Sequence, residues 1–157
     1  MPSFEREMES IIRMLEANGY SVRDGMMPLD DFRLFLTPPG FEVESEEVFK
    51  LKASDKVHCA AQIIIGGEIR NAYYNQDEEL RGKFKGMVKS ASGVSELDFF
   101  EVADDGKDFS ISLRSEFQIS NLSEDVFADA MDRLNMAGGS IEDLINSYFD
   151  NFIDEEA

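Results

Sequence analysis

The chain has 157 residues, 43% of them apolar, and its 33 acidic and 15 basic residues give a formal net charge of -18. This charge disfavours nucleic acid and anionic membrane surfaces as partners, because both are bound through clustered lysine and arginine side chains. The length and the apolar content are typical of one domain with a substantial core, so we expect a single domain over residues 1–157. No segment resembles a signal peptide or a membrane span, and we expect a cytoplasmic protein.

Residues 4–18 predict the first helix, because their apolar side chains recur with the 3.6-residue period of one helix face. Residues 20–30 contain Gly25 and Pro28, and we expect this segment to be irregular. Every second side chain is apolar in residues 31–37, which precede a Pro-Pro-Gly turn. This alternation predicts the first strand.

Residues 41–53 predict a second strand with an interruption. Its inward side chains are Phe41 and Val43 and, beyond the Glu46-Glu47 step, Phe49, Leu51 and Ala53. The two consecutive glutamates are expected to mark a β-bulge or a short break in the strand.

Residues 57–66 predict a central strand, because one face is apolar and the other is only mildly polar. They contain His58 and Cys59, the single histidine and the single cysteine of the chain. Adjacent side chains of a strand point to opposite faces, so this pair is not expected to form a catalytic dyad. We expect Cys59 to be a small buried apolar side chain.

Residues 69–74 are expected to continue the sheet after a Gly66-Gly67 turn, and residues 76–91 predict the second long helix. This helix has four basic and three acidic residues, whereas residues 93–157 have 17 acidic and three basic ones. The contrast suggests that the helix pairs with an acidic surface of a second copy, although an ordinary amphipathic core helix explains the same pattern. Its apolar stripe consists of Leu80, Phe84, Met87, Val88 and Ala91.

Residues 97–103 and 108–119 predict a hairpin around the turn at Asp104-Asp105-Gly106-Lys107. Two helices are expected after it, the first capped by Ser123 and the second beginning after Gly138-Gly139. The resulting order, α-β-β-β-α-β-β-α-α, predicts an α+β fold. We expect a mostly antiparallel five-stranded sheet packed with helices.

Sequence motifs for catalysis or cofactor binding are absent. One histidine and one cysteine cannot build a zinc site, and no phosphate-binding or dinucleotide-binding glycine motif occurs. The acidic turn at residues 104–108 lacks the spacing of an EF-hand loop. We therefore expect no catalytic residue, no metal and no cofactor, while carboxylate-only binding of a divalent ion stays open.

The order of elements and the acidity resemble the secretion-chaperone-like fold of class I type III secretion chaperones and YbjN-type domains. The resemblance covers residues 4–18, 31–37, 41–53, 57–66, 76–91, 97–103, 108–119 and 123–136. It implies a homodimer with an apolar surface for an extended polypeptide. It also implies that Leu80, Phe84, Met87 and Val88 lie near the dimer contact. The second C-terminal helix is additional to that pattern.

These expectations favour a non-enzymatic, homodimeric domain that binds a protein or peptide client in a chaperone-like or regulatory role. The alternative is an enzyme or small-ligand binder whose site joins distant carboxylates with Tyr73, Tyr74 and Arg114. An exposed apolar groove would favour the first hypothesis. A polar pocket with converging carboxylates and shifted pKa values would favour the second.

Overall fold

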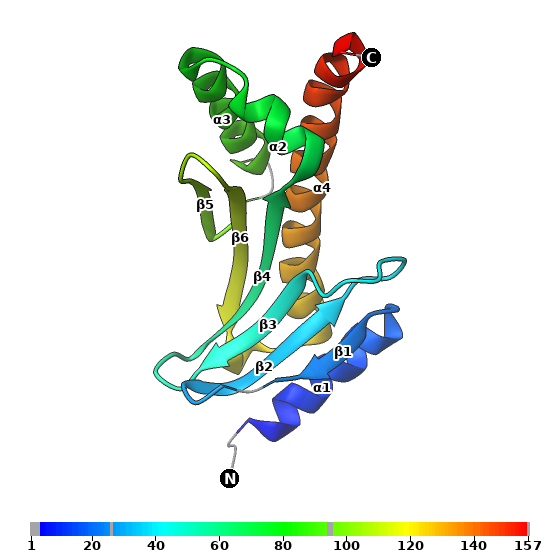
Figure 1. The fold of residues 1–157 in the computed structure, drawn as a ribbon. Helices are drawn as coiled ribbons and strands as arrows, with labels where there is room; N and C mark the ends of the chain where they lie inside the picture. Colours follow the sequence, from blue (N-terminus) through cyan, green and yellow to red (C-terminus); the bar gives the residue numbers. More distant parts are fainter. Residues whose placement is uncertain (1–3, 26, 94–95, 157) are drawn as a thin grey trace. The chain divides into compact units, whose positions relative to one another are not determined.

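The computed structural model describes residues 4–25, 27–93 and 96–156, with side chains described as far as Asp150 (Figure 1). The described strands form one six-stranded sheet in the order β1-β2-β3-β4-β6-β5. In chain order the elements are α1 (Glu5–Ala17), β1 (Ser21–Asp24), β2 (Asp30–Thr37), β3 (Glu46–Leu51), β4 (Lys56–Ile65), α2 (Gly67–Tyr74), α3 (Glu78–Gly93), β5 (Phe99–Asp104), β6 (Phe109–Gln118), a 3₁₀ turn (Ile119–Asn121) and α4 (Glu124–Glu156).

The chain divides into two compact units that are interleaved in sequence. Unit 1 consists of Met1–Ala61 and Arg114–Asp132, and unit 2 consists of Gln62–Leu113 and Arg133–Ala157. Strands β4 and β6 and helix α4 each contribute residues to both units. The single domain expected from the sequence stays a prediction.

Unit 1 contains α1 and the antiparallel strands β1 to β4. The predicted first helix and first strand are confirmed as α1 and β2. Side chains of β2 are buried at every second position, as expected for a strand with one face toward a core. Fully buried core residues of this unit include Ile11, Phe32, Leu34, Leu36, Val48, Val57, Cys59 and Ala130.

Three predictions for unit 1 are wrong. Residues 21–24 form β1 rather than an irregular segment, and residues 41–45 lie outside any strand, with the side chains of Phe41 and Val43 exposed. In β3 the buried side chains are Glu46, Val48 and Lys50, so the inward face is opposite to the predicted one. The buried Lys50 ammonium lies 2.6 Å from Asp31 Oδ2, which compensates its charge.

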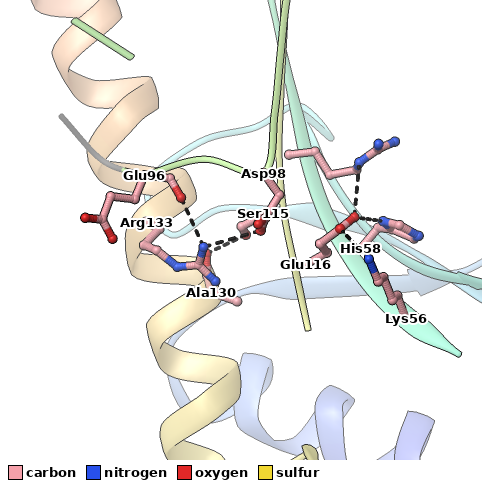
Figure 2. A network of polar contacts seen from close by, with 9 residues as sticks. Lys56, His58, Glu96, Asp98, Ser115, Glu116, Ala130 and Arg133 are labelled. Atoms are coloured by element: carbon pink, nitrogen blue, oxygen red, sulfur yellow. Dashed lines mark hydrogen bonds and ion pairs between the residues drawn. The ribbon is translucent and has the colours of Figure 1, made fainter. Parts of the chain in front are cut away.

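Strand β6 carries one polar side chain on its buried face. Ser115 is fully buried and donates a hydrogen bond of 2.7 Å to the carbonyl of Ala130 in α4 (Figure 2). The buried serine hydroxyl therefore has a hydrogen-bond partner within unit 1, the Ala130 carbonyl oxygen of the α4 backbone.

Unit 2 contains α2, α3 and the strands β5 and β6, which are neighbours in the sheet. The predicted hairpin and the predicted second long helix are confirmed as β5–β6 and α3. The continuation of the sheet over residues 69–74 is wrong, because these residues belong to α2. The core contains a cluster of four aromatic rings, in which Phe84 contacts Tyr73, Phe109 and Phe149, and Tyr73 also contacts Phe109.

One helix, α4, replaces the two predicted C-terminal helices. Ser123 caps it as expected, accepting a hydrogen bond from the Val126 amide. The helix continues through Gly138 and Gly139, because its buried stripe keeps a helical period on both sides of the glycines. That stripe consists of Phe127, Ala130, Met131, Leu134, Ala137, Ile141, Ile145 and Phe149.

The α+β class and the antiparallel pairing are therefore confirmed, whereas the strand number and the order of elements are not. The described part of the chain has six strands instead of five, an additional helix α2, and one C-terminal helix instead of two. No described helix combines the length and the apolar character needed to cross a bilayer.

Candidate functional site

The four predicted contact residues of α3 separate into two pairs. Phe84 and Val88 are fully buried in the core of unit 2, so they do not face solvent as a contact would require. Leu80 and Met87 are 37% and 42% exposed. They lie seven residues apart, which places them on the same side of the helix. We call the solvent-exposed set Leu80, Lys83, Met87 and Ser90 the α3 outer face.

A groove of about 530 Å³ opens beside the α3 outer face. It is lined by Lys83, Gly86, Met87, Ser90 and Ala91 of α3 and by Leu144 of α4. A Cβ atom at Gly86 would meet no other atom within 4 Å, so the helix backbone is open to an approaching group here. Three of its six lining residues, Met87, Ala91 and Leu144, have apolar side chains.

A polar cluster occupies another part of unit 2, where α2 meets the β5–β6 hairpin. The hydroxyl groups of Tyr73 and Tyr74 donate hydrogen bonds of 2.8 and 2.7 Å to the two carboxylate oxygens of Asp104. Lys85 Nζ lies 3.0 Å from Asp104 Oδ2, and the Gly106 amide donates to Oδ1 at 3.0 Å. Asp104 therefore receives four donors, two on each oxygen.

These contacts shift the acid–base behaviour of the cluster. Burial alone would raise the pKa of Asp104, but the hydrogen bonds from Tyr74, Lys85, Gly106 and Tyr73 together hold it well below its usual range. Burial and the bond to Asp104 raise the pKa of Tyr74 to about 12 and raise the pKa of Tyr73 further. Both tyrosines are thus neutral donors near neutral pH, and Asp104 is an anion.

A pocket of about 510 Å³ opens beside this cluster. Its lining residues are Tyr74, Glu78, Arg81, Gly82, Lys85, Asp104 and Gly106. The sequence hypothesis of a small-ligand site named Tyr73 and Tyr74, and the structure brings both to the same carboxylate. The third named residue, Arg114, belongs to unit 1, where its Nε lies 3.9 Å from Glu116 Oε2.

Unit 1 carries a row of stacked side chains on the sheet face opposite to its buried one. The guanidinium of Arg33 lies 4.2 Å from the ring centre of Phe49, and the Phe49 ring stacks on His58 at 5.0 Å. Register places Arg33 opposite Phe49, and Phe49 opposite His58. A second pair of this kind joins β1 and β2, where the Arg23 guanidinium lies 4.4 Å from the ring centre of Phe35. We call these residues the sheet ladder.

Glu116 ends the ladder at β6. Its carboxylate lies 3.1 Å from Lys56 Nζ and 3.1 Å from His58 Nδ1, and Figure 2 shows both side chains directed at it. The angles of the histidine contact do not make a well-aligned hydrogen bond. Burial and the nearby Arg114 charge hold the pKa of His58 below its usual value, which Glu116 offsets only in part. His58 is therefore neutral at pH 7.

Every ladder arginine also has a carboxylate partner. Arg23 lies 2.8 Å from Glu44, and Arg33 lies 2.7 Å from the buried Asp30 and 2.6 Å from Glu47. The ladder is thus satisfied within unit 1 and offers little unpaired charge to a ligand.

Within the described ranges, no group of three or more histidine, cysteine, aspartate and glutamate side chains is placed to hold a metal ion.

Sequence reasoning missed three residues of the polar pocket. The sequence predicts Asp104 as part of a hairpin turn, and Arg81 and Lys85 as two of the four basic residues of a helix. Both assignments are true locally, since Asp104 Oδ1 also accepts a bond within the turn. No sequence spacing indicates the pairing of Tyr74 with Asp104, because it joins a helix to a strand 30 residues later.

A solved structure of an uncharacterised protein from Methanothermobacter thermautotrophicus is similar to this chain, with a TM-score of 0.79 and 17% sequence identity. The likeness covers 90% of this chain and 98% of that one. A scan of protein-family models and a search of curated proteins gave no match. The resemblance to secretion chaperones and YbjN-type domains stays a prediction. At 17% identity the likeness shows a shared fold alone, so this chain has the fold of that protein.

Proposed function

We propose that the chain is a non-enzymatic protein-binding domain, and that its first partner is a second copy of itself. The observation that carries the proposal is the α3 outer face, where Leu80 and Met87 are exposed beside an apolar groove. Exposed methionine is common at adaptable protein-binding surfaces, because its flexible side chain fits partners of different shape. Two exposed side chains and one groove cover less surface than a stable protein–protein interface buries, so residues around the α3 outer face must also contribute to the contact.

Charge favours a second copy as the occupant. Helix α3 has four basic and two acidic residues, whereas α4 has ten acidic residues and one basic residue. Lys83 and Lys89 have no ion-pair partner among the described residues, so they are available to carboxylates of another molecule. In a two-fold dimer each α3 can face acidic residues of its mate, and the same contact then occurs twice.

A polypeptide client is the second part of the proposal. Its basis is the resemblance of the element order and acidity to the secretion-chaperone-like fold, which implies a chaperone-like or regulatory dimer. The part of α4 beyond residue 136 is additional to that pattern, and α2 and β1 are two further differences. The self-association step is therefore the part that can be tested first.

Size-exclusion chromatography with light scattering tests self-association over a range of protein concentrations. We expect a dimer for the wild-type chain and a dissociation constant at least about tenfold weaker for Met87→Glu, which places a carboxylate at the groove. Met27→Glu is the matched control, because Met27 is 52% exposed in unit 1. A wild-type chain that stays monomeric at every concentration, or equal weakening by both variants, would contradict the proposal.

The second hypothesis, a small-ligand binder, is favoured by one specific observation. The polar pocket beside Asp104 contains two cationic side chains and a network of fixed donors, while the groove at Met87 is a separate surface of α3. Both uses of the helix are compatible, because no residue lines both hollows.

A further inference from the structure

Arg81 and Lys85 stand one turn apart on α3 and both line the pocket of about 510 Å³ in unit 2. Residues four apart in a helix share a face, so the two charged groups reach the same volume. Two cations converging on one hollow are unusual in a chain with a net charge of -18.

Internal acceptors hold both cations in place. Lys85 Nζ lies 3.0 Å from Asp104 Oδ2, and Arg81 Nη1 donates a hydrogen bond of 2.9 Å to the carbonyl of Gln76. An ammonium and a guanidinium each have several N–H donors, so each group keeps donors for a further acceptor. Fixed donors bind an anion with a smaller loss of side-chain entropy than mobile surface lysines do.

Asp104 acts as a positioning residue in this arrangement. Tyr73, Tyr74 and the Gly106 amide already occupy its oxygens together with Lys85, so the carboxylate has little capacity to bind a ligand itself. Its charge is offset by Lys85. Two further charged side chains line the pocket, the half-buried Arg81 and the exposed Glu78. Water screens the exposed carboxylate more strongly, so the positive charge of Arg81 acts more strongly on a ligand than the negative charge of Glu78 does.

Gly82 leaves room next to the two cations. A Cβ atom at this position would meet no atom within 4 Å, and the residue lines the pocket. Glycine inside a helix costs about 1 kcal/mol relative to alanine. The open space at Gly82 therefore belongs to the same pocket as Arg81 and Lys85.

We propose that this pocket binds a small molecule through an oxyanion, a carboxylate or a phosphate, held by Arg81 and Lys85. The site lies apart from the α3 outer face and does not require self-association. A ligand bound here contacts only side chains of α2, α3 and the β5–β6 hairpin.

Amide chemical shifts of the ¹⁵N-labelled full chain test the proposal, with inorganic phosphate and acetate as separate probes and chloride at equal ionic strength as the blank. We expect saturable shifts around Arg81, Gly82 and Gly106 with one of the two oxyanions. The probe that saturates first distinguishes the phosphate from the carboxylate class. No saturable shift, or the same shifts with chloride, would overturn the site.

Variants separate a built site from non-specific attraction. Arg81→Gln and Lys85→Gln should each weaken probe binding about tenfold, the effect of losing one charge-assisted contact. Lys89→Gln removes a charge from the same helix outside the pocket and should change binding by less than about twofold. Equal effects of all three variants would show general electrostatic attraction and contradict the proposal.

A glycine pair gives the sharpest control. Gly82→Ala should stabilise α3 while weakening probe binding, whereas Gly86→Ala should stabilise α3 and leave probe binding unchanged, because Gly86 lines the other groove. Light scattering on the same samples reports self-association independently. A failed dimer with intact probe binding rejects only the proposed function, and the reverse result rejects only this site.

Discussion

The sheet ladder of unit 1 and the α3 outer face of unit 2 both place cations beside apolar side chains, but they use the cations differently. Arg23 and Arg33 stack on phenylalanine rings and are also paired with carboxylates. On α3, Lys83 has no ion-pair partner among the described residues, and Met87 beside it is exposed. A sheet face can therefore be completed by its own side chains, while a helix face of similar composition stays available to another molecule.

The largest effect on stability should come from substitution of Phe84, which lies on the buried side of α3, opposite to the α3 outer face. Phe84→Ala removes a fully buried ring that contacts Tyr73, Phe109 and Phe149, and should lower the free energy of unfolding by about 3–5 kcal/mol. Met87→Ala should change it by less than about 0.5 kcal/mol. Urea denaturation followed by circular dichroism measures both. Similar losses for the two variants would show that Met87 is a core residue.

An intermediate effect is expected where the ladder is most tightly packed. The Phe35 ring contacts the Arg23 guanidinium, and a Cβ atom at Gly25 would lie 2.3 Å from Phe35 Cε2. Gly25→Ala should therefore destabilise the protein by about 1–3 kcal/mol.

The control for Gly25 has the opposite sign. Gly139→Ala adds a methyl group inside α4, where a Cβ atom meets no atom within 4 Å, and should stabilise the protein by up to about 1 kcal/mol. Thermal unfolding of both variants measures the difference. If Gly139→Ala destabilises instead, the helix ends at the glycines as the sequence predicts, and the comparison of the two glycines fails.

The smallest effect is the pH dependence of the ladder at His58. Its folded pKa lies below the usual 6.5, so the unfolded chain binds a proton first as the pH falls. The stability that neutral His58 contributes is complete above pH 6.5 and is lost progressively below it. The stability of His58→Gln relative to the wild type should rise by less than about 1 kcal/mol between about pH 7.5 and pH 5.5. Urea midpoints at each pH provide the measurement, and a difference that stays constant would contradict it.

Long periodic segments were predictable, because their pattern reports which side faces the core. Helix α1, strand β2 and helix α3 appear where the spacing of apolar residues places them. Strand β1 was not predictable in this way, because Val22 is its single apolar residue. Its pairing with β2 is a tertiary contact that no local pattern reports. The aromatic residues Tyr73 and Tyr74 favour a strand by propensity, yet packing of Tyr73 into the core keeps them in α2.

The inverted face of β3 has a physical reason that sequence patterns do not contain. Phe49 points away from the core, where its ring contacts Arg33 and His58, whereas Lys50 points inward, where Asp31 compensates its charge. The residues of the polar pocket were recognisable as polar groups. Their convergence depends on pairing between α2, α3 and β5, which no local pattern encodes.

The interleaving of the two units has a consequence for the order of folding. The first segment of unit 1 ends at Ala61, and its second segment is Arg114–Asp132. Residues 62–113 of unit 2 are therefore synthesised before unit 1 has its last strand and helix residues. No single cut separates the units into two continuous pieces. During synthesis unit 1 stays incomplete until residue 132 has left the ribosome, and contacts between segments this far apart in the sequence slow folding.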